Sequence, residues 1–584
     1  MPRLFTRSRI AGKLPSFVSM LRRAHSSTSL PTDWNSRPEF FKFTAARWVC
    51  NEEHEMAMRH VPFDMNELAK LAAQSVGAAR CVNVEQMGQG LFCKPFIFTM
   101  EDGSQVVGKV PTRNAGLPHF MTASEVATMD FVRSLTSVLS LHADLIVYSQ
   151  ARNVLGTPAP KVLAWSSRAS ESPIGAEFIL MEVARGIPLA VVWDEMGIEA
   201  KCKLIVSLGK IQNAWASTSF SQYGSLYYAY DLDHSQPCLL TKRDGSQVEE
   251  PRFAVGPSNA RSLLDDGRIN VKFDRGPWDT VEQYKRAVGY REISCIQQMA
   301  ELPPVAVGLY GPRTYTRSRP KKLAALDYYL QLVNHLLPTD PSISASFLWH
   351  NDLHYQNIFV DLEKPWEISS IIDWQSSDLR PLFDHVQKPF FLDHVGPPLK
   401  LRERPKLPEN FSEMSPEAQK EAENLHYLME MSAYFKLLTY RDTRTLYHAM
   451  EFAETKSFEM MQLVQKLAED GEAMYQWLVK GLEEEWSNLP GVRAAGNPSF
   501  PFHFSSEEAS TIDQDAADTE LGMELMSSLK VSLGDLCPDR GMVRQDSYDA
   551  ARALLRQKKE ELMAQLGCSE DERRVWDHCW PFDN

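Results

Sequence analysis

Four polar side chains of different chemistry stand within eight residues in the stretch WHNDLHYQNIFV, residues 349–360. They are His350, Asp352, His354 and Asn357, and an apolar run follows them directly. Such a group before a strand can form a metal cluster, a hydrolytic base, a phosphate-transfer loop or an ordinary hydrogen-bonded turn. A metal cluster is disfavoured, because the two histidines would bind one ion together only on a helix, whereas this segment leads into a strand.

A second carboxylate stands at the end of a predicted hairpin that follows these residues. A strand at 358–360 turns through DLEKPWE and returns at 368–372, and Asp373 comes directly after the returning strand. The spacing is therefore His-x-Asp-x4-Asn, with a further Asp sixteen residues beyond the Asn. Protein kinases have the same arrangement in their catalytic loop and in the metal-binding motif that follows it.

Phosphoryl transfer explains why these residue types belong together. One carboxylate orients the attacking hydroxyl, while an amide and a second carboxylate hold Mg²⁺ on the nucleotide phosphates. We therefore predict Asp352 as the catalytic carboxylate and His350 as a catalytic-loop residue that braces it through hydrogen bonds. Asn357 and Asp373 are the predicted magnesium ligands. The alternative is a polar loop whose acidic groups only accept hydrogen bonds from the backbone.

The upstream sequence contains candidate nucleotide-binding residues, and they occur in the same order as in a kinase. Gly88 and Gly90 lie in the first strand-to-strand turn, and Lys109 ends a later strand. Glu125 follows sixteen residues after Lys109, in a predicted helix, and is expected to form an ion pair with it. A competing interpretation is that Thr122 and Glu125 form a helix-capping box.

A short linker is expected to join the two halves of the site. The segment from Met181 to Ala184 comes at the end of the apolar strand EFILM, and its backbone can meet the edge of a purine. The residues predicted to bind the nucleotide are therefore Gly88, Gly90, Lys109, Glu125, Met181 and Val183.

Periodicity predicts the elements that must position these residues. Apolar alternation and turn signals give strands, and longer 3.6-residue patterns give helices. The predicted strands are 80–87, 95–100, 105–110, 160–166 and 177–183, and the helices around them are 51–75, with a turn at Pro62, and 122–135. Residues 195–480 are mostly helical with loops at 221–280, and further helices are predicted at 506–533, 547–565 and 569–579.

These elements predict an α+β, bilobal, protein-kinase-like fold. Its N-lobe is an antiparallel sheet, its C-lobe is mostly helical, and a helical extension follows at the C-terminus. The predicted units are a transit peptide at 1–32, an N-terminal helical extension at 33–78, the N-lobe at 79–183, the C-lobe with the catalytic loop at 184–480 and the C-terminal extension at 481–584.

Charge is distributed unevenly along the 584 residues. Residues 1–32 hold six basic residues and no acidic one, and they are rich in serine, which is typical of a mitochondrial transit peptide. The rest carries a net charge of −20, so nucleic acid is not an expected partner.

No apolar run reaches the length of a transmembrane helix. Nine scattered cysteines without a C-x-x-C pair argue against a disulfide framework.

The segment W-H-x-D-L-H-x-x-N-I-F-V followed by I-I-D-W-Q-S resembles the aminoglycoside phosphotransferase and choline kinase superfamily. More closely, the chain resembles the fungal mitochondrial phosphotransferases of the "altered inheritance of mitochondria protein 9" type. The stretches that carry this resemblance are Arg47-Trp48 with Asn51-Glu52, 114–133, 160–167, 253–258, 274–280, 348–354 and 580–584.

The resemblance implies a bilobal kinase-like fold with Asp352 as the base, Asn357 and Asp373 on magnesium and Lys109 on the phosphates. Two features depart from it. The glycine turn reads MGQGLFCK, with Cys93 where the family tends to have Asn, and a thiol is a weaker donor than an amide. Residues 136–150 look inserted, as a true insertion or as a retained intron in the gene sequence.

The leading hypothesis is a mitochondrial phosphotransferase that moves the γ-phosphoryl group of Mg-ATP to a hydroxyl of a small molecule. The second is a nucleotide-binding scaffold that supports mitochondrial maintenance without turnover. A protein kinase is disfavoured, because the chain lacks the peptide-binding motif.

The acceptor is expected in the helical lobe, among the loops at 221–280 and the helices at 384–450. Acidic residues there, such as Glu292, either attract a cationic compound or are simply solvated.

Overall fold

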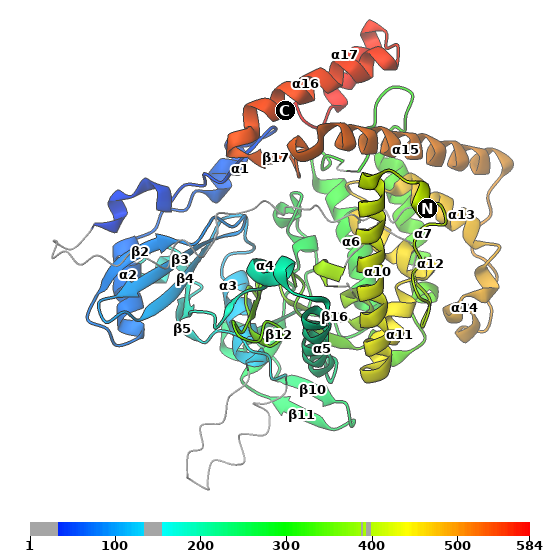
Figure 1. The fold of residues 1–584 in the computed structure, drawn as a ribbon. Helices are drawn as coiled ribbons and strands as arrows, with labels where there is room; N and C mark the ends of the chain where they lie inside the picture. Colours follow the sequence, from blue (N-terminus) through cyan, green and yellow to red (C-terminus); the bar gives the residue numbers. More distant parts are fainter. Residues whose placement is uncertain (1–32, 134–154, 306, 387–388, 393–398, 584) are drawn as a thin grey trace.

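The computed structural model describes residues 33–133, 155–305, 307–386, 389–392 and 399–583 (Figure 1). The predicted transit peptide at 1–32 and the segment at 136–150 lie outside these residues. Within them, the predicted α+β class with an antiparallel-sheet lobe and a mostly helical lobe is confirmed.

The N-lobe is a five-stranded antiparallel sheet with the strand order β2-β3-β4-β6-β5. Along β3, half-buried and buried residues alternate, because successive side chains point to opposite faces. Gly103, with a φ of 84°, turns β3 into β4 as the sequence predicts. The strands are β2 (Cys81–Gln86), β3 (Cys93–Met100), β4 (Gln105–Pro111), β5 (Val162–Ser166) and β6 (Phe178–Glu182).

A helix covers each face of this sheet. Helix α2 (Met65–Ser75) packs with Val106 and Val110 of β4 in one apolar cluster. Helix α3 (Phe120–Val132) belongs to the other large cluster, against which Val107 of β4 packs. Because side chains alternate along a strand, Lys109 shares the face of Val107 and is directed towards α3.

The C-lobe is built mainly from helices around one large apolar cluster. Its longer helices are α5 (Ile198–Trp215), α6 (Val281–Gln298), α7 (Arg319–Leu336), α10 (Pro416–Asp442), α11 (Arg444–Phe452), α12 (Lys456–Leu463) and α13 (Glu472–Leu482). Short helices accompany them at α4 (Leu189–Val192), α8 (Pro341–Ser344) and α9 (Leu382–His385).

Residues 221–280 hold strands as well as the expected loops, because residues 218–256 contain five short strands that were not predicted. These are β8 (Thr218–Phe220), β9 (Ser225–Tyr228), β10 (Cys238–Lys242), β11 (Gln247–Glu250) and β12 (Phe253–Gly256). A second five-stranded sheet, ordered β11-β10-β8-β13-β16, joins three of them to β13 (Ser346–Trp349) and β16 (Asp378–Pro381). Strands this short show little periodicity of their own, and two of their partners lie far away in the sequence.

The predicted hairpin after the polar loop is present. Strands β14 (Ile358–Val360) and β15 (Ile368–Ile371) pair antiparallel, and β7 (Ile187–Pro188) extends them to three strands. All three residues of β14 are buried, so the loop before it rests on a fixed strand.

The C-terminal extension folds into helices at the predicted places. They are α15 (Ser506–Leu533), α16 (Tyr548–Gln565) and α17 (Glu570–Cys579), and a short helix that was not predicted, α14 (Pro490–Ala494), precedes them. Capping boxes at Ser505 and Ser569 fix where α15 and α17 begin. Between α15 and α16, β17 (Met542–Arg544) pairs antiparallel with β1 (Ala46–Trp48) of the N-terminal extension, and α1 (Glu52–Arg59) follows β1.

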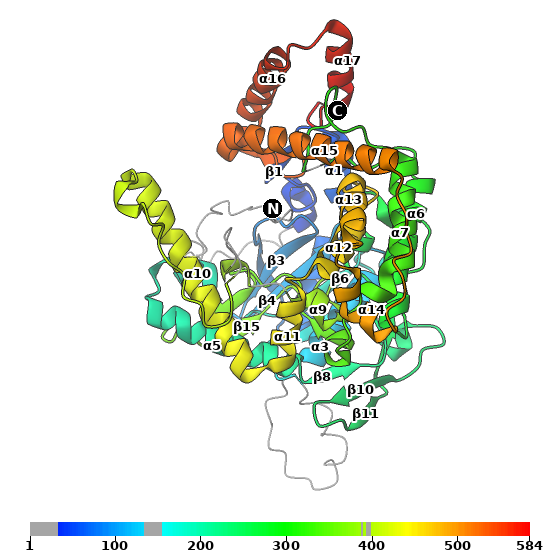
Figure 2. The ribbon, with the colours of Figure 1, turned by 90° about the vertical axis from the view of Figure 1, so that its right-hand side faces the viewer.

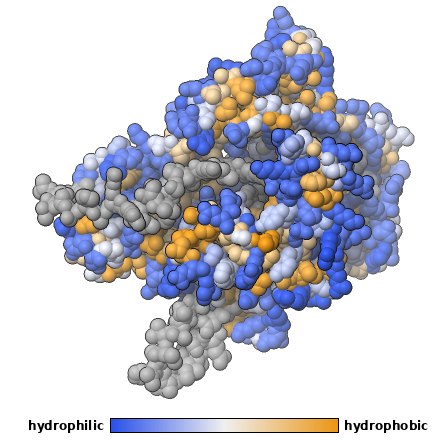
Figure 3. Space-filling view, in the orientation of Figure 1, coloured by the Kyte–Doolittle hydropathy of each residue, from blue (hydrophilic) through white to orange (hydrophobic). Residues whose placement is uncertain are grey.

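The two extensions therefore lie side by side. Figures 1 and 2 both place α1, close to the start of the described chain, beside the C-terminal helices. On the face seen in Figure 3, hydrophobic residues form separate groups among hydrophilic ones. None of the helices in the described ranges is both long and apolar enough to cross a membrane.

Candidate active site

The ammonium group of Lys109 joins the two lobes. Its Nζ lies 2.7 and 3.0 Å from the carboxylate oxygens of Glu125 on α3 and 2.6 Å from Oδ1 of Asp373 in the C-lobe. Burial alone would lower the pKa of Lys109, but the carboxylates of Asp373 and Glu125 raise it above its usual value. Lys109 is therefore a fixed positive charge between two carboxylates.

The ion pair expected between Lys109 and Glu125 is thus present, and the competing capping box is not. Helix α3 begins at Phe120 after His119, so Thr122 lies inside the helix and not at its N-cap. Glu125 lies in the second turn and is buried, and burial raises the pKa of its carboxyl group. The nearby ammonium group of Lys109 opposes that shift.

Asp373 is set in a sharp backbone turn after β15. Its φ is 62° and that of Ser376 is 59°, both in the left-handed region that aspartate tolerates better than most residues. Trp374 between them is buried and donates from Nε1 to the carbonyl of Ile371 at 3.1 Å. The Asp373 side chain remains 38% exposed, so it is open to a ligand while Lys109 holds one of its oxygens.

His350 ties the catalytic loop to the segment before Asp373. Its Nε2 lies 2.9 Å from the carbonyl oxygen of Ile372, and its Nδ1 is 3.2 Å from the amide nitrogen of Asp352. A carbonyl only accepts and an amide N–H only donates, so Nε2 carries the proton and Nδ1 accepts. The ring is buried, and burial lowers the pKa of His350, which keeps the imidazole neutral.

Asn357 closes the loop from its other end. Its Nδ2 donates to the carbonyl oxygen of Asp352 at 3.0 Å, and its backbone carbonyl accepts from the amide of Ile372 at 3.0 Å. The first bond uses the amide nitrogen of the side chain, so the side-chain oxygen of Asn357 is the atom left for a metal ion. Asp352 itself is 59% exposed at its side chain, and its Oδ2 lies 3.5 Å from Nε2 of His354.

A hydrogen-bonded network around Asn351 was missed by the sequence analysis. Asn351 Nδ2 donates to the carbonyl of Ser376 at 3.1 Å and to Oδ1 of Asp378 at 2.8 Å. Arg380 donates to the same Asp378 oxygen at 2.8 Å and also to Asn351. Together with His350, this network fixes the catalytic loop against both sides of the turn at Asp373. The only signal in the sequence is the polar residue between His350 and Asp352.

The glycine turn lies between β2 and β3, as predicted. Gly88 has a φ of 69°, which favours glycine, and a Cβ on Gly90 would lie 3.3 Å from Sγ of Cys93. Burial raises the pKa of the Cys93 thiol to about 12, so the group that replaces the family's Asn is neutral. Lys109, Asp373 and Glu125 all act electrostatically on this thiol, which places Cys93 beside the charged centre.

The predicted linker leaves the sheet at the end of β6. Met181 is buried and still paired with Val107 of β4, whereas Val183 is half-buried and lies beyond the strand. The amide of Glu182 donates to the carbonyl of Lys161 at 2.8 Å. The linker therefore begins from a fixed strand.

A magnesium site fits this donor set. Among the described residues, no three His, Cys, Asp or Glu side chains gather as a metal cluster. Asn357 and Asp373 offer one amide oxygen and one carboxylate, and Mg²⁺ commonly binds one or two protein ligands together with phosphate oxygens and water. These two residues would hold the ion against the nucleotide phosphates.

Glu292 neither attracts a cationic acceptor nor faces solvent, so both expectations for it are wrong. It is fully buried, and its carboxylate oxygens lie 2.9 and 3.0 Å from Arg268 and 2.8 Å from Arg291. Burial would raise the pKa of Glu292, but the two guanidinium groups lower it below its usual value. This acid is therefore neutralised inside the C-lobe and is not available to a ligand.

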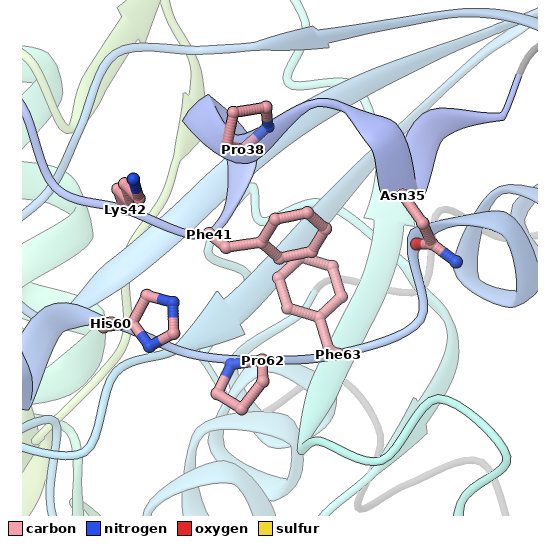
Figure 4. Close-up of a pocket in the computed structure, with 7 residues that line it drawn as sticks. All are labelled: Asn35, Pro38, Phe41, Lys42, His60, Pro62 and Phe63. Carbon is pink, nitrogen blue, oxygen red and sulfur yellow. The ribbon is translucent and has the colours of Figure 1, made fainter.

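One pocket lies away from the catalytic loop, in the N-terminal extension (Figure 4). Phe41 and Phe63 meet edge to face inside it, with ring centroids 5.1 Å apart. Its lining residues are Asn35, Pro38, Phe41, Lys42, His60, Pro62 and Phe63. None of them is a predicted site residue.

The antiparallel-sheet lobe and the mostly helical lobe have the arrangement that the resemblance to phosphotransferases implies. Residues 129–384 match the model of the phosphotransferase enzyme family, and this match confirms the resemblance seen in the catalytic loop and the hairpin.

Relatives that align with most of the chain are fungal proteins. A subtelomeric hrmA-associated cluster protein of Aspergillus fumigatus is 26% identical over 546 residues, which are 86% of this chain and 97% of the relative. The "Altered inheritance of mitochondria protein 9, mitochondrial" of Yarrowia lipolytica is 23% identical, over 88% of this chain and 86% of its own length.

Two solved structures are also similar. A putative fructosamine-3-kinase from Thermobifida fusca is 12% identical, with a TM-score of 0.31 over 78% of this chain and 99% of its own. The aminoglycoside phosphotransferase APH(2'')-Ib in its ADP-bound form is 12% identical, with a TM-score of 0.31 over 72% of this chain and 97% of its own.

Proposed function

We propose that this protein is a phosphotransferase that moves the γ-phosphoryl group of a magnesium-bound nucleotide, ATP, to a hydroxyl of a small molecule. The observation that carries this proposal is the contact of Lys109 with both Glu125 and Asp373. This contact joins the N-lobe to the turn that follows the catalytic loop.

Each side chain has a distinct part in this reaction. Lys109 binds the nucleotide phosphates and is held in place by Glu125. Asn357 and Asp373 would hold a magnesium ion, and the ion would supply positive charge to the phosphates. Asp352, which is largely exposed, orients the acceptor hydroxyl. As the oxygen–phosphorus bond forms and the bond to the β-phosphate oxygen breaks, the hydroxyl proton passes to Asp352.

Mitochondrial localisation is part of the proposal. Residues 1–32 carry only positive charges, and relatives of this chain are named as mitochondrial proteins. The acceptor is a small molecule because the chain has the loop-and-hairpin sequence of small-molecule phosphotransferases and lacks the peptide-binding motif of protein kinases.

A nucleotide-binding scaffold is the second candidate. It is favoured by Cys93, a neutral thiol in the glycine turn where the family tends to have an amide donor. The presence of Asp352, Asn357 and Asp373 favours turnover instead.

A metabolite screen separates the two candidates. Purified protein lacking residues 1–32 would be given Mg-ATP and pools of hydroxyl compounds, and ADP release would be measured. Release that depends on an added acceptor and on Asp352 supports the phosphotransferase. Nucleotide binding without any such release supports the scaffold.

A further inference from the structure

The middle residue of the glycine turn is bound to the N-terminal extension. The side-chain oxygen of Gln89 accepts hydrogen bonds from the amides of Thr44 at 2.5 Å and Ala45 at 2.9 Å. Its Nε2 donates to the hydroxyl of Thr44 at 3.0 Å. Three hydrogen bonds from one side chain thus join the turn between Gly88 and Gly90 to a segment more than forty residues earlier in the sequence.

A second contact attaches the strand after the turn to the same segment. Lys94 at the start of β3 is buried, and its Nζ donates to the carbonyl of Lys42 at 2.7 Å. Burial lowers the pKa of Lys94 to about 8. A buried ammonium group is costly unless it is hydrogen-bonded, so this contact holds Lys42 in place.

The N-terminal segment is joined directly to the C-terminal extension. Strand β1 pairs with β17, and the amide of Val49 donates to the carbonyl of Gly541 at 2.8 Å. Arg47 pairs with Glu52 through two hydrogen bonds of 2.5 and 2.9 Å, and its guanidinium lies 3.6 Å from the ring centre of Tyr548 on α16. Residues 42–49 together with β17 are called the strap below.

The extension that carries β17 is docked on the C-lobe. The amide of Leu309 donates to the carbonyl of Gly522 on α15 at 2.9 Å, and Arg313 forms an ion pair with Glu572 on α17. Arg540, close to β17, lies 3.5 Å from Asp265 of the C-lobe. The strap therefore connects the glycine turn of the N-lobe to elements fixed on the helical lobe.

We infer that Gln89 is a positioning residue, through which the strap holds the glycine turn in the geometry that binds nucleotide phosphates. This inference rests on the proposed function. Backbone N–H groups stabilise phosphate charge best when they are fixed in advance, and a glycine-rich turn is otherwise free to move. Phe92 in the same turn also contacts the C-lobe, because the guanidinium of Arg261 lies 3.8 Å from the centre of its ring.

The test measures Mg-ATP affinity by calorimetry in two variants and their matched controls. Gln89→Ala removes the three hydrogen bonds, and Gln105→Ala removes an exposed glutamine of the same sheet whose side-chain amide donates to Thr99. Arg47→Ala loosens the strap away from the site, and the control Arg574→Ala removes an exposed arginine outside the strap that pairs with Asp571 within α17.

We expect Gln89→Ala to weaken Mg-ATP binding about tenfold, which corresponds to about 1.4 kcal/mol. Arg47→Ala should weaken it in the same direction, although Arg47 does not touch the site, and the two controls should match the parent. In the double variant the effects should not add, because both act through one connection. Hydrogen exchange at residues 88–92 should quicken in both variants.

The experiment distinguishes failure of this inference from failure of the proposed function. If the parent binds Mg-ATP and Gln89→Ala binds it equally well, the positioning role of Gln89 is overturned while the proposed function stands. If the parent itself does not bind Mg-ATP, the proposed function fails and this inference fails with it. Additive effects in the double variant would overturn the link between Gln89 and the C-terminal extension.

Discussion

The imidazole of His350 donates to the carbonyl oxygen of Ile372 across a distance of 2.9 Å. With the bond from the amide of Ile372 to the carbonyl of Asn357, this hydrogen bond fastens the catalytic loop to the residue that precedes Asp373. Because the other ring nitrogen accepts from the amide of Asp352, one neutral histidine sets the spacing between the two halves of the site.

Replacing His350 by Ala should lower both stability and turnover. The amide of Asp352 and the carbonyl of Ile372 would lose their partner, and a buried unsatisfied group costs about 1–3 kcal/mol. Denaturant unfolding measures the first effect and ADP release the second. An unchanged unfolding midpoint would contradict the bracing role.

The parent should also lose stability in acid because of His350. The pKa of this buried imidazole is lowered in the folded state, so below its usual value of 6.5 the unfolded chain binds more protons than the folded one. The free energy of unfolding therefore falls as the pH drops below about 6.5. Unfolding at several pH values measures this trend, and the His350→Ala variant should lack that part of the dependence.

Replacing Asp352 by Asn should separate catalysis from binding. The change keeps the size of the side chain but removes its charge, so Mg-ATP affinity should stay near the parent value while turnover falls by ~10²–10⁴. Asp373→Ala is the matched comparison, because it should abolish Mg-ATP binding. Calorimetry and ADP release on the same preparations check both. Equal loss of affinity in the two variants would show that the division of roles is wrong.

Replacing Lys109 by Met should destabilise the fold in a pH-dependent way. Removing one partner of a buried ion pair costs ~3–5 kcal/mol, because Glu125 would be left charged and buried. Burial already raises the pKa of Glu125, so the variant should regain part of its stability in acid, where this carboxyl group takes up a proton. Unfolding across a pH series measures this, and adding Glu125→Gln should restore part of the loss at neutral pH.

Residues 1–35 should carry a reporter protein into mitochondria. Positive charge is the feature that defines the segment, so replacing Arg3, Arg7, Arg9, Arg22 and Arg23 by Gln should leave the reporter in the cytosol. Microscopy and cell fractionation measure this outcome. Normal import of the substituted reporter would remove the targeting proposal.

Local patterns predicted the parts of the molecule whose partners are close in sequence. The hairpin of β14 and β15, the turn at Gly103 and the start of α15 at Ser505 each depend on residues that are near neighbours along the chain. The ion pair of Lys109 and Glu125 was predicted correctly because the two residues lie on a strand and on the helix that follows it. The helix packs on one face of that strand, so their side chains can meet there.

Contacts between distant segments were missed for the opposite reason. The sequence around Asn351 does not indicate its contact with Asp378 and Arg380, because that contact depends on the pairing of β13 with β16. In the same way, nothing near Gln89 predicts that Thr44 will fold back to it. The burial of Glu292 was missed because its partner Arg268 lies in a segment without clear periodicity.

The pairing of β1 with β17 makes the order of synthesis matter. Ala46 lies opposite Arg544, so almost the whole chain must be made, or threaded through a membrane, before the first strand finds its partner. A growing chain would therefore hold a nearly complete pair of lobes while its glycine turn still lacked support from the other end of the molecule. Nucleotide binding would reach its full affinity only after β17 had paired with β1, so tight binding would mark a fully folded chain.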